Sequence, residues 1–171
     1  MQPVKINRFL RAGIGLLAVA LVYVIYAAIH EHVVEAGDTA PAFTVTTDSG
    51  RTVSLSQFGG KLLVLNFWAS WCQPCVEETP SLSAFAQRYA DKGVVVLAVS
   101  VDKDPQAYQR FVDRFRPAFL TARDLAIHQD YGTFIYPESY VIDASGKVLR
   151  KYAEAKNWMS SDMTSEINSL L

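Results

Sequence analysis

The sequence predicts an α/β fold, in which a mixed central sheet is flanked by helices and follows one N-terminal transmembrane helix. Three observations carry this prediction. Strand-like apolar runs alternate with helical patterns, the last two runs are separated by a short turn, and an uncharged apolar stretch of 18 residues lies near the N-terminus. Alternating strands and helices build parallel strands, whereas a hairpin adds antiparallel ones, so the sheet is expected to be mixed.

The apolar stretch, AGIGLLAVALVYVIYAAI, occupies residues 12–29. Three basic residues precede it: Lys5, Arg8 and Arg11. At about 1.5 Å per residue, the stretch nearly crosses a hydrocarbon core of about 30 Å. Basic residues stay on the cytoplasmic side, so residues 1–11 are expected in the cytoplasm and the chain after residue 29 outside it. The alternative is a cleaved signal peptide with a cleavage site at Val34–Ala36, but the length of the apolar stretch favours an uncleaved anchor.

Residues 30–41, HEHVVEAGDTAP, are polar and broken by glycine and proline, which predicts a short linker. His30 and His32 have no third ligand nearby, so they are expected to be solvated rather than to bind a metal. The remaining residues, 42–171, are expected to form one domain.

The first elements after the linker are a hairpin, a central strand and a helix. FTVTTDSGRTVSL, residues 43–55, alternates β-branched with polar residues around Asp48-Ser49-Gly50, which predicts the hairpin. KLLVLNFWA, residues 61–69, is continuously apolar, as expected of a central strand that is covered on both faces. A helix is expected from about Cys72 to Tyr89, followed by a second buried strand over residues 94–101.

A second helix is expected over residues 105–115, with Asp104 at its start and Pro117 as its stop. A short extended piece over residues 118–121 and a helical stretch over residues 124–131 come next.

The C-terminal part is expected to form a hairpin and a helix. SYVID, residues 139–143, and KVLRKYA, residues 147–153, read as the two strands, joined across Ala144-Ser145-Gly146. The chain from about Ser160 is expected to be helical.

Composition narrows the range of functions. Half of the residues are hydrophobic, which suffices for a sizeable core, and 16 basic residues nearly balance 17 acidic ones. Nucleic-acid binding calls for a clustered excess of Lys and Arg, so no nucleic-acid partner is expected.

The two cysteines of the chain, Cys72 and Cys75, are separated only by Gln73 and Pro74. Cys72 follows a predicted strand and opens a predicted helix, where unpaired N–H groups and the helix dipole favour a thiolate. Cys75 comes one turn later on the same face, within reach of a disulfide. Pro74 fits the first helical turn, where its missing N–H costs little. We therefore expect Cys72 to be the exposed attacking thiolate and Cys75 to be the buried resolving thiol.

Two structural roles compete with redox chemistry for this pair. A purely structural disulfide enclosing two residues removes little unfolded-state entropy, because that entropy grows with loop length. A zinc site needs four well-spaced ligands, and His128 stands alone in the sequence. The pattern therefore favours a redox-active disulfide.

The stretch NFWASWCQPC, with Pro80 five residues after the second cysteine, resembles the active site of the thioredoxin superfamily. Within it, the chain is most similar to membrane-anchored thiol–disulfide oxidoreductases of the TlpA, ResA and CcmG type. The apolar anchor, the N-terminal hairpin, a strand–helix insertion between residues 94 and 121, and YPESYVID carry this likeness. It covers residues 40–171 and implies a thioredoxin-like fold.

The resemblance assigns roles to residues around the cysteines. Pro137 is implied to be a cis-proline that faces the disulfide and exposes the backbone of Tyr136 to an incoming peptide. Trp71 is expected on the docking face, whereas Trp68 is expected in the core. Glu138 matches a glutamate of the cytochrome-maturation relatives and is expected to contact substrate.

Proton transfer is implied to involve a different carboxylate from that of cytosolic thioredoxins. Their buried aspartate is replaced here by Asn66, which cannot titrate. Glu78 matches the glutamate of the TlpA, ResA and CcmG group and is expected to exchange protons with Cys75. Gln73 and Pro74, between the cysteines, are expected to support the site, and neighbouring Glu77 is expected to be solvated.

The function implied by the resemblance is reduction of protein disulfides outside the cytoplasm, by a protein held in the cytoplasmic membrane with its domain in the periplasm or outside the cell. The expected substrates are an apocytochrome c before haem attachment or a copper-site assembly protein. A membrane electron-transfer protein is expected to reduce the disulfide again. The cycle needs no bound organic cofactor and no metal.

Other functions stay open at this point. A thiol oxidase or isomerase uses the same motif, although such proteins usually carry a large insertion or a dimerisation domain. A copper carrier of the related group has C-x-x-x-C rather than C-x-x-C. A peroxiredoxin-like peroxidase usually has T-x-x-C, whereas Trp71 directly precedes Cys72 here.

Overall fold

The computed structural model describes residues 8–29, 33–59 and 62–171. They belong to two units: residues 1–32, with helix α1 (Arg8–Ile29), and Val33–Leu171, with the remaining elements. In the part of the chain that is described, no helix is long and apolar enough to cross a membrane, so the anchor expected at residues 12–29 is not confirmed. The candidate ligands His30 and His32 lie outside the described residues.

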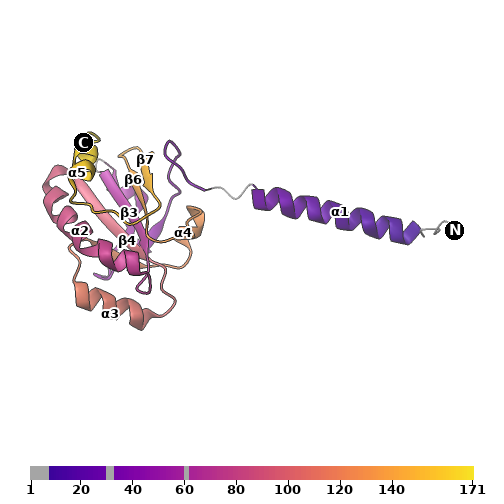
Figure 1. The fold of residues 1–171 in the computed structure, drawn as a ribbon, viewed down its shortest axis with the longest axis horizontal. Coiled ribbons are helices and arrows are strands. Elements are labelled where there is room, and N and C mark those ends of the chain that lie inside the picture. Colours follow the sequence, from indigo (N-terminus) through magenta and orange to yellow (C-terminus); the bar gives the residue numbers. More distant parts are fainter. Residues whose placement is uncertain (1–7, 30–32, 60–61) are drawn as a thin grey trace. The chain divides into compact units, whose positions relative to one another are not determined.

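The second unit is built on a five-stranded sheet with the order β5-β4-β3-β6-β7 (Figure 1). The strands are β3 (Leu62–Trp68), β4 (Val94–Ser100), β5 (Leu120–Arg123), β6 (Glu138–Ile142) and β7 (Val148–Tyr152). Strands β3, β4 and β5 are parallel, whereas β6 is antiparallel to β3, and β7 is antiparallel to β6. The expected mixed sheet is therefore confirmed.

The helices begin and end close to the signals in the sequence. They are α2 (Gln73–Tyr89), α3 (Pro105–Phe115), α4 (Ile127–Asp130) and α5 (Ser161–Asn168), with a short 3-10 turn, η2 (Ala90–Lys92), after α2. Asp104 caps α3 by accepting the N–H of Gln106 at 2.8 Å, and Ser160 caps α5 by accepting the N–H of Met163. Residue Arg116, just before Pro117, ends α3 in the left-handed conformation.

Two weak predictions between α3 and β6 are corrected by the structure. The extended piece expected at residues 118–121 is strand β5, which begins at Leu120 and ends at Arg123. The helical stretch expected from residue 124 begins only at Ile127. The reason is that the Asp124 carboxylate accepts the N–H groups of Ala126 and Ile127, which forms a turn before the helix.

The expected N-terminal hairpin consists of β1 (Thr44–Thr46) and β2 (Thr52–Ser54), followed by the 3-10 turn η1 (Leu55–Phe58). It forms its own two-stranded sheet. Its turn is held against the insertion, because both carboxylate oxygens of Asp48 accept the hydroxyl of Tyr108 at 2.7 Å.

The two faces of the sheet are covered by different elements. Side chains of α2 and α5 pack on one face, where Val64 of β3 contacts the cluster that contains Phe85 and Ile167. The hairpin and α4 cover the other face, where Phe67 of β3 joins the cluster that contains Phe43. All seven residues of β3 are buried, because the strand is central and covered on both sides.

Part of the expected linker packs against the domain. Val34 is 0% exposed and lies in the core, and its N–H donates to the Tyr131 carbonyl at 3.1 Å. Further along, the N–H of Gly37 donates to the carbonyl of Val148, at the start of β7, and the N–H of Ala40 donates to that of Gly146 in the preceding turn, both at 2.8 Å. Residues 33–41 are therefore fixed by main-chain bonds and one buried valine, and they do not behave as a free tether.

Candidate active site

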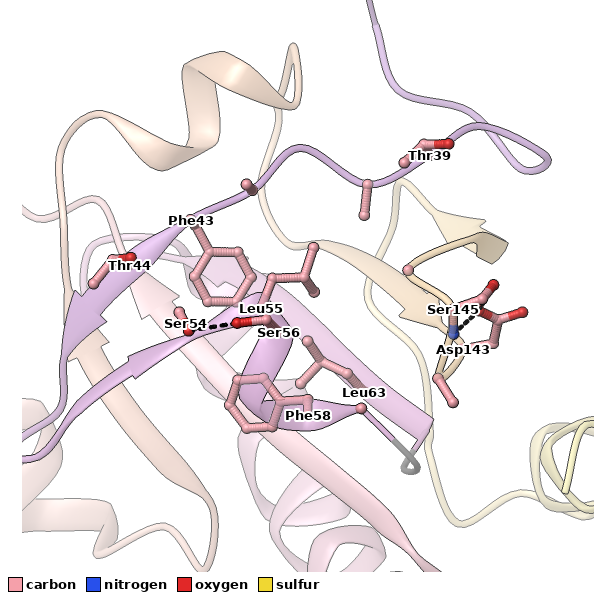
Figure 2. Close-up of a pocket in the computed structure, with 15 residues that line it drawn as sticks. Thr39, Phe43, Thr44, Ser54, Leu55, Ser56, Phe58, Leu63, Asp143 and Ser145 are labelled. Carbon is pink, nitrogen blue, oxygen red and sulfur yellow. Dashed lines mark hydrogen bonds between the residues drawn. The ribbon is translucent and has the colours of Figure 1, made fainter.

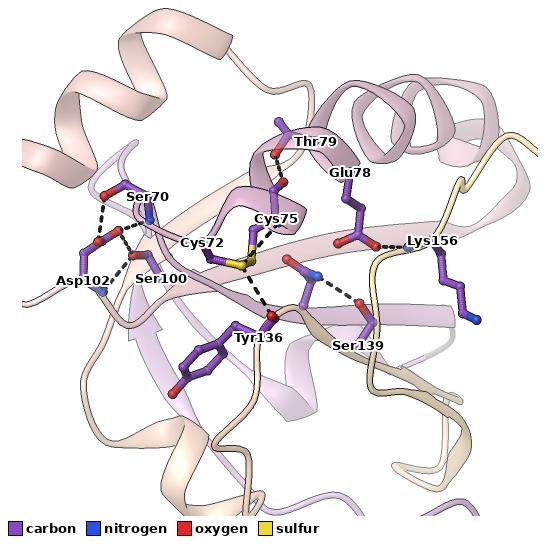
Figure 3. Close-up of a disulfide and its surroundings, with 11 residues drawn as sticks. Ser70, Cys72, Cys75, Glu78, Thr79, Ser100, Asp102, Tyr136, Ser139 and Lys156 are labelled. Atoms are coloured by element: carbon purple, nitrogen blue, oxygen red, sulfur yellow. Dashed lines mark hydrogen bonds between the residues drawn. A yellow bond between two sulfur atoms is a disulfide. The ribbon is translucent and has the colours of Figure 1, made fainter.

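The two cysteines lie where β3 gives way to α2 (Figure 3). Cys72 is the N-cap of α2, and its sulfur accepts the N–H of Cys75 at 3.3 Å. The two residues form a disulfide with 5.3 Å between their Cα atoms. A sulfur at a helix N-terminus is stabilised as a thiolate by unpaired N–H groups and by the helix dipole. Cys72 is therefore the cysteine whose reduced form is better suited to attack.

The expected exposure of Cys72 is wrong for the disulfide form. Cys72 is 6% exposed and Cys75 is 2% exposed, so both are buried, with Cys72 the less buried of the two. The physical reason is the loop before β6, because the carbonyl oxygen of Tyr136 lies 3.4 Å from the Cys72 sulfur.

The peptide bond between Tyr136 and Pro137 is cis, as the resemblance implies. It places the Tyr136 backbone against the disulfide, while the Tyr136 ring meets the Trp71 ring edge-on with 6.0 Å between centroids. Trp71 is 67% exposed, in agreement with a surface position. Trp68 is buried, and its ring lies tilted against that of Phe111 with 4.2 Å between centroids, in agreement with a core position.

Two exposed apolar residues beside this loop were not singled out in the sequence. Phe134 and Ile135 directly precede Tyr136, and both side chains are mostly exposed. The Trp71 ring, which contacts the Tyr136 ring, is exposed as well. The available signal was their position directly before Tyr136 and Pro137.

Glu78 is buried on the face of α2 that also carries Cys75 (Figure 3). Its Oε1 accepts the indole N–H of Trp158 at 2.6 Å and the backbone N–H of Lys156 at 3.1 Å. Burial raises the pKa of Glu78, and the hydrogen bonds from Trp158, Lys156 and Asn66 oppose that rise. The sequence indicated this carboxylate, but it did not indicate Trp158, which is 80 residues away.

The three supporting residues have different environments. Asn66 is buried in β3 beneath the disulfide and donates its side-chain N–H to the Ser139 hydroxyl at 2.9 Å. Gln73 is exposed and donates to the carboxylate of Glu77 at 2.9 Å. Glu77 is also exposed, in agreement with the expected solvated position. Pro74 lies in the first turn of α2, as expected.

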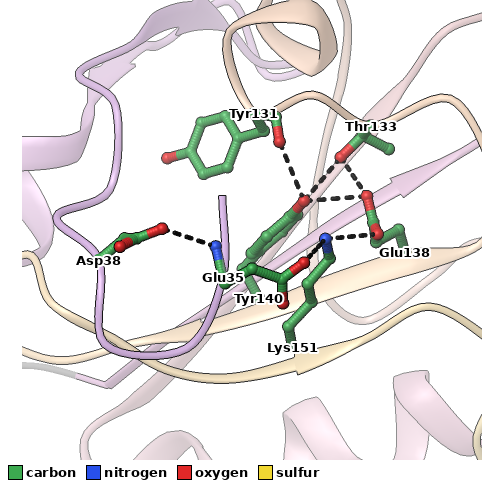
Figure 4. A network of polar contacts seen from close by, with 7 residues as sticks. All are labelled: Glu35, Asp38, Tyr131, Thr133, Glu138, Tyr140 and Lys151. Atoms are coloured by element: carbon green, nitrogen blue, oxygen red, sulfur yellow. Dashed lines mark hydrogen bonds and ion pairs between the residues drawn. The ribbon is translucent and has the colours of Figure 1, made fainter. Parts of the chain in front are cut away.

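Glu138 does not lie on the surface, and the expected substrate contact through its side chain is not supported by its position. Its carboxylate is buried and accepts hydrogen bonds from the hydroxyls of Thr133 and Tyr140 (Figure 4). The Lys151 ammonium lies 3.3 Å from Glu138 Oε1 and 3.0 Å from Glu35 Oε1. A buried carboxylate needs such partners, so this network holds the residue after Pro137 in the interior.

Asp102 is a site residue that the sequence reasoning missed. It follows β4, and its buried carboxylate accepts the N–H and the hydroxyl of Ser70, both at 2.8 Å, and the hydroxyl of Ser100 at 2.7 Å (Figure 3). The carboxyl ends of parallel strands meet at one edge of a sheet, which was the available signal. The aspartate therefore fixes the loop that leads to Cys72.

A separate hollow lies away from the cysteines. It encloses about 650 Å³ between residues 39–44, η1 and the β6–β7 turn. Phe43, Leu63 and Asp143 are among its lining residues (Figure 2). Leu63 stands at the start of β3, whereas the cysteines follow its end. This hollow is therefore not part of the candidate active site.

Three features define a class of protein, the thiol–disulfide oxidoreductases with a thioredoxin-like fold: a disulfide at a helix N-terminus, the carbonyl of the residue before a cis-proline beside its sulfur, and a buried carboxylate one turn away. Comparison with known proteins agrees. Residues 35–171 match the Redoxin family model, and the chain belongs to this family as a thiol–disulfide oxidoreductase of the ResA type.

The similar proteins carry related names. The thiol-disulfide oxidoreductase ResA of Bacillus thuringiensis subsp. konkukian is 37% identical over 71% of this chain and 71% of its own. ResA of Bacillus subtilis is 31% identical over 85% of this chain and 84% of its own. A crystal structure from Chlorobium tepidum, described as a thiol:disulfide interchange protein DsbE, is 30% identical, covers 81% of this chain and 98% of its own, and has a TM-score of 0.73.

Proposed function

We propose that the protein reduces disulfides of other proteins outside the cytoplasm. The observation that carries the proposal is the position of Cys72, at the start of α2 and in contact with the Tyr136 carbonyl. Disulfides form readily in an oxidising compartment, so the electrons that reduce them must be supplied from outside that compartment. Relatives named ResA share at least 31% identity with the chain over most of its length.

The reaction is an exchange of disulfides. In the reduced protein, the Cys72 thiolate attacks one sulfur of a substrate disulfide, so that a mixed disulfide forms and the other substrate thiolate leaves. Cys75 gives its proton to a base, and its thiolate attacks the Cys72 sulfur. The Cys72–Cys75 disulfide forms, the second substrate thiolate leaves, and the substrate has gained two electrons. A partner protein carrying a dithiol reduces Cys72–Cys75 again.

We assign the base in this cycle to Glu78. Its position one turn after Cys75 and its raised pKa support the assignment, because a group that titrates nearer neutral pH exchanges protons more readily. The proton taken from Cys75 is then available to a departing substrate thiolate.

Substrate binding is assigned to the backbone of Tyr136, the ring of Trp71 and Pro137. An extended segment of the substrate pairs with the Tyr136 backbone, as a strand pairs with a sheet edge. The exposed side chains of Phe134 and Ile135 add apolar contact surface beside it. The buried position of Glu138 gives that residue a supporting role beneath Pro137.

The substrate class we propose is a folded or unfolded exported protein with a reducible disulfide, such as an apocytochrome c or a copper-site assembly protein. The electrons come from a membrane electron-transfer protein. The cycle uses the Cys72–Cys75 disulfide as its redox group and requires no organic cofactor.

We also propose that residues 12–29 hold the protein in the cytoplasmic membrane, with the N-terminus in the cytoplasm. These residues carry no charge, and the described apolar side chains of α1, such as Leu16 and Leu17, are exposed. Apolar side chains that protein does not cover are stabilised in lipid. The full chain is expected in bacterial membranes after alkaline extraction, and a variant lacking residues 1–29 in the soluble fraction. Recovery of the full chain in the soluble fraction contradicts this proposal.

The experiment that tests the proposed function is the reduction potential of the full chain in mild detergent, equilibrated against defined thiol buffers. A value near about −270 mV, as in thioredoxin, identifies a reductant, whereas a value near about −120 mV identifies an oxidant and overturns the proposal. A Cys75→Ser variant then captures substrates, because its mixed disulfides are not resolved. Exported proteins with paired cysteines are the expected captures.

A further inference from the structure

Trp158 reaches the active-site carboxylate from the C-terminal segment between β7 and α5. The indole N–H donates to Glu78 Oε1 at 2.6 Å, and the backbone N–H of Lys156 donates to the same oxygen at 3.1 Å. The Trp158 ring is fully buried and packs against the Phe85 ring of α2, with 5.2 Å between the ring centroids. The donor is therefore held by packing on α2, independently of the hydrogen bond that it makes.

Two donors on one oxygen fix the carboxylate. Because the indole and the Lys156 N–H both point at Oε1, the plane of the Glu78 carboxyl group cannot turn freely, and Oε2 stays outside this pair of bonds. Figure 3 shows the Glu78 side chain directed to the same side of α2 as the disulfide. One oxygen of the Glu78 carboxylate is thus anchored on the C-terminal segment.

A shallow hollow connects this carboxylate with solvent. It encloses about 370 Å³ between α2 and residues 155–157, and Glu78 itself is among its lining residues. Glu78 is otherwise buried. A proton that leaves the carboxylate for water therefore passes along the segment that carries Lys156.

We propose that Trp158 is a positioning residue for thiol–disulfide exchange, which holds the Glu78 carboxylate between Cys75 and the solvent hollow. The inference rests on the proposed function, in which Glu78 takes the proton of Cys75. Trp158 acts through Glu78 and touches no reacting sulfur. Its N–H favours the ionised carboxylate, which is the form that accepts a proton.

The groups that face Glu78 set the sign of the expected effect. They are the neutral amide of Asn66 on β3 and the Lys156 ammonium, itself paired with Glu154, on the C-terminal segment. On α2 itself, Cys75 lies three residues before Glu78, and the neighbouring Glu77 is exposed. Burial raises the pKa of Glu78, and the Trp158 hydrogen bond is the first of the contributions that lower it. Replacement of Trp158 by phenylalanine removes this contribution, so the pKa of Glu78 rises further.

The test is the rate of the resolving step in the full chain between pH 4 and pH 9. Reduced protein is mixed with a fluorescent peptide disulfide, and release of the second peptide thiol is followed in Trp158→Phe, in Glu78→Gln and in the double variant. Glu78→Gln is expected to slow the step about 100-fold. Trp158→Phe is expected to move the pH midpoint of the step upward by about one unit. In the Glu78→Gln background, Trp158→Phe is expected to cause no further shift.

Trp68→Phe is the matched control, because this buried indole N–H has no hydrogen-bond partner among the described residues. It is expected to leave the pH midpoint unchanged. If Glu78→Gln has no effect, the proposed role of Glu78 fails. If Glu78→Gln slows the step while Trp158→Phe keeps the original midpoint, only the positioning role of Trp158 fails.

A measurement without a Trp158 variant keeps the proposal testable if Trp158→Phe does not fold. The indole ¹H–¹⁵N resonance of Trp158 in the ¹⁵N-labelled full chain is followed from pH 4 to pH 9. The chemical shift of this resonance is expected to change with pH, with the same pH midpoint as the resolving step. In Glu78→Gln, this pH-dependent change is expected to be absent. A Trp158 resonance that does not change across this range overturns the inference.

Discussion

The carboxylate of Asp102 accepts both the backbone N–H and the side-chain hydroxyl of Ser70, each at 2.8 Å. Ser70 stands two residues before Cys72, and Asp102 is 1% exposed at the end of β4. The pair therefore joins the loop before the active-site helix to the neighbouring strand. Ser100 donates a third hydrogen bond at 2.7 Å, so the buried charge is well satisfied.

Replacement of Asp102 by alanine is expected to lower the free energy of unfolding by about 3 kcal/mol, because hydrogen bonds to a charged group are lost and the Ser70 N–H remains unpaired. Urea denaturation of the disulfide form measures it. The control is Asp113→Ala, which removes an exposed carboxylate that accepts a hydrogen bond from the Gln109 side chain and is expected to change little. Equal stability of the two variants contradicts the role assigned to Asp102.

Glu78→Gln is expected to change how stability depends on pH. The pKa of Glu78 is raised in the folded protein above its usual value of 4.5, so the folded state binds a proton more readily than the unfolded state. Its contribution to stability is therefore complete below the unfolded pKa and is lost as pH rises through the folded pKa. Glutamine does not titrate and avoids this loss.

The free energy of unfolding of Glu78→Gln, relative to the unchanged chain, is thus expected to increase from pH 4 to pH 8. Urea titrations at several pH values measure the difference, and Glu77→Gln, with its exposed carboxylate, serves as the control. A difference that stays constant over this range is the result that contradicts the pKa direction.

Lys151→Met is expected to destabilise the protein by about 3 kcal/mol, because it removes the ammonium beside the buried Glu138 carboxylate. The Lys151 side chain is itself only 11% exposed, so solvent screens the pair weakly. Glu35→Gln removes the other, exposed partner of Lys151 and is expected to cost less than about 1 kcal/mol. Thermal or urea unfolding distinguishes the two, and a larger loss in Glu35→Gln argues against the network as described.

Trp71→Ala is expected to lower kcat/KM for a protein disulfide about tenfold, because an aromatic contact with the substrate is lost. The urea midpoint is expected to stay the same, since the ring is mostly exposed. Leu171→Ser, an exposed apolar residue at the C-terminus, is the control. If Trp71→Ala is destabilised enough to explain its lower kcat/KM, the lower rate no longer supports a contact between Trp71 and the substrate.

Val34→Ala is expected to lower the free energy of unfolding by about 2 kcal/mol, because it leaves a cavity in the core. The neighbouring Val33 is 41% exposed and lies outside the core, so Val33→Ala provides a matched control with an expected change below about 0.5 kcal/mol. Urea denaturation of both variants tests whether this part of the expected linker belongs to the folded domain. Equal urea midpoints of Val34→Ala and Val33→Ala indicate that this part of the expected linker does not belong to the folded domain.

Most elements of the fold were predictable from local patterns. The continuous apolar run of β3 and the Asp104 cap placed a strand and a helix within one residue of their observed bounds, and the helix start expected near Ser160 agrees with α5. The stretch after α3 was less predictable, because the short apolar pieces there suit a strand or a helix equally well. The turn formed by Asp124 decided the start of α4.

The chemistry of the site was predictable from the local pattern, because two cysteines with two residues between them at the junction of a strand and a helix favour a redox pair. The groups that surround the pair depend on how distant segments fold together. Glu78 and Trp158 are 80 residues apart, and Ser70 and Asp102 are 32 residues apart. Local periodicity reports neighbours within a turn or a hairpin, whereas the partner of a buried carboxylate is selected by how distant segments pack, since burial without hydrogen bonds is too costly.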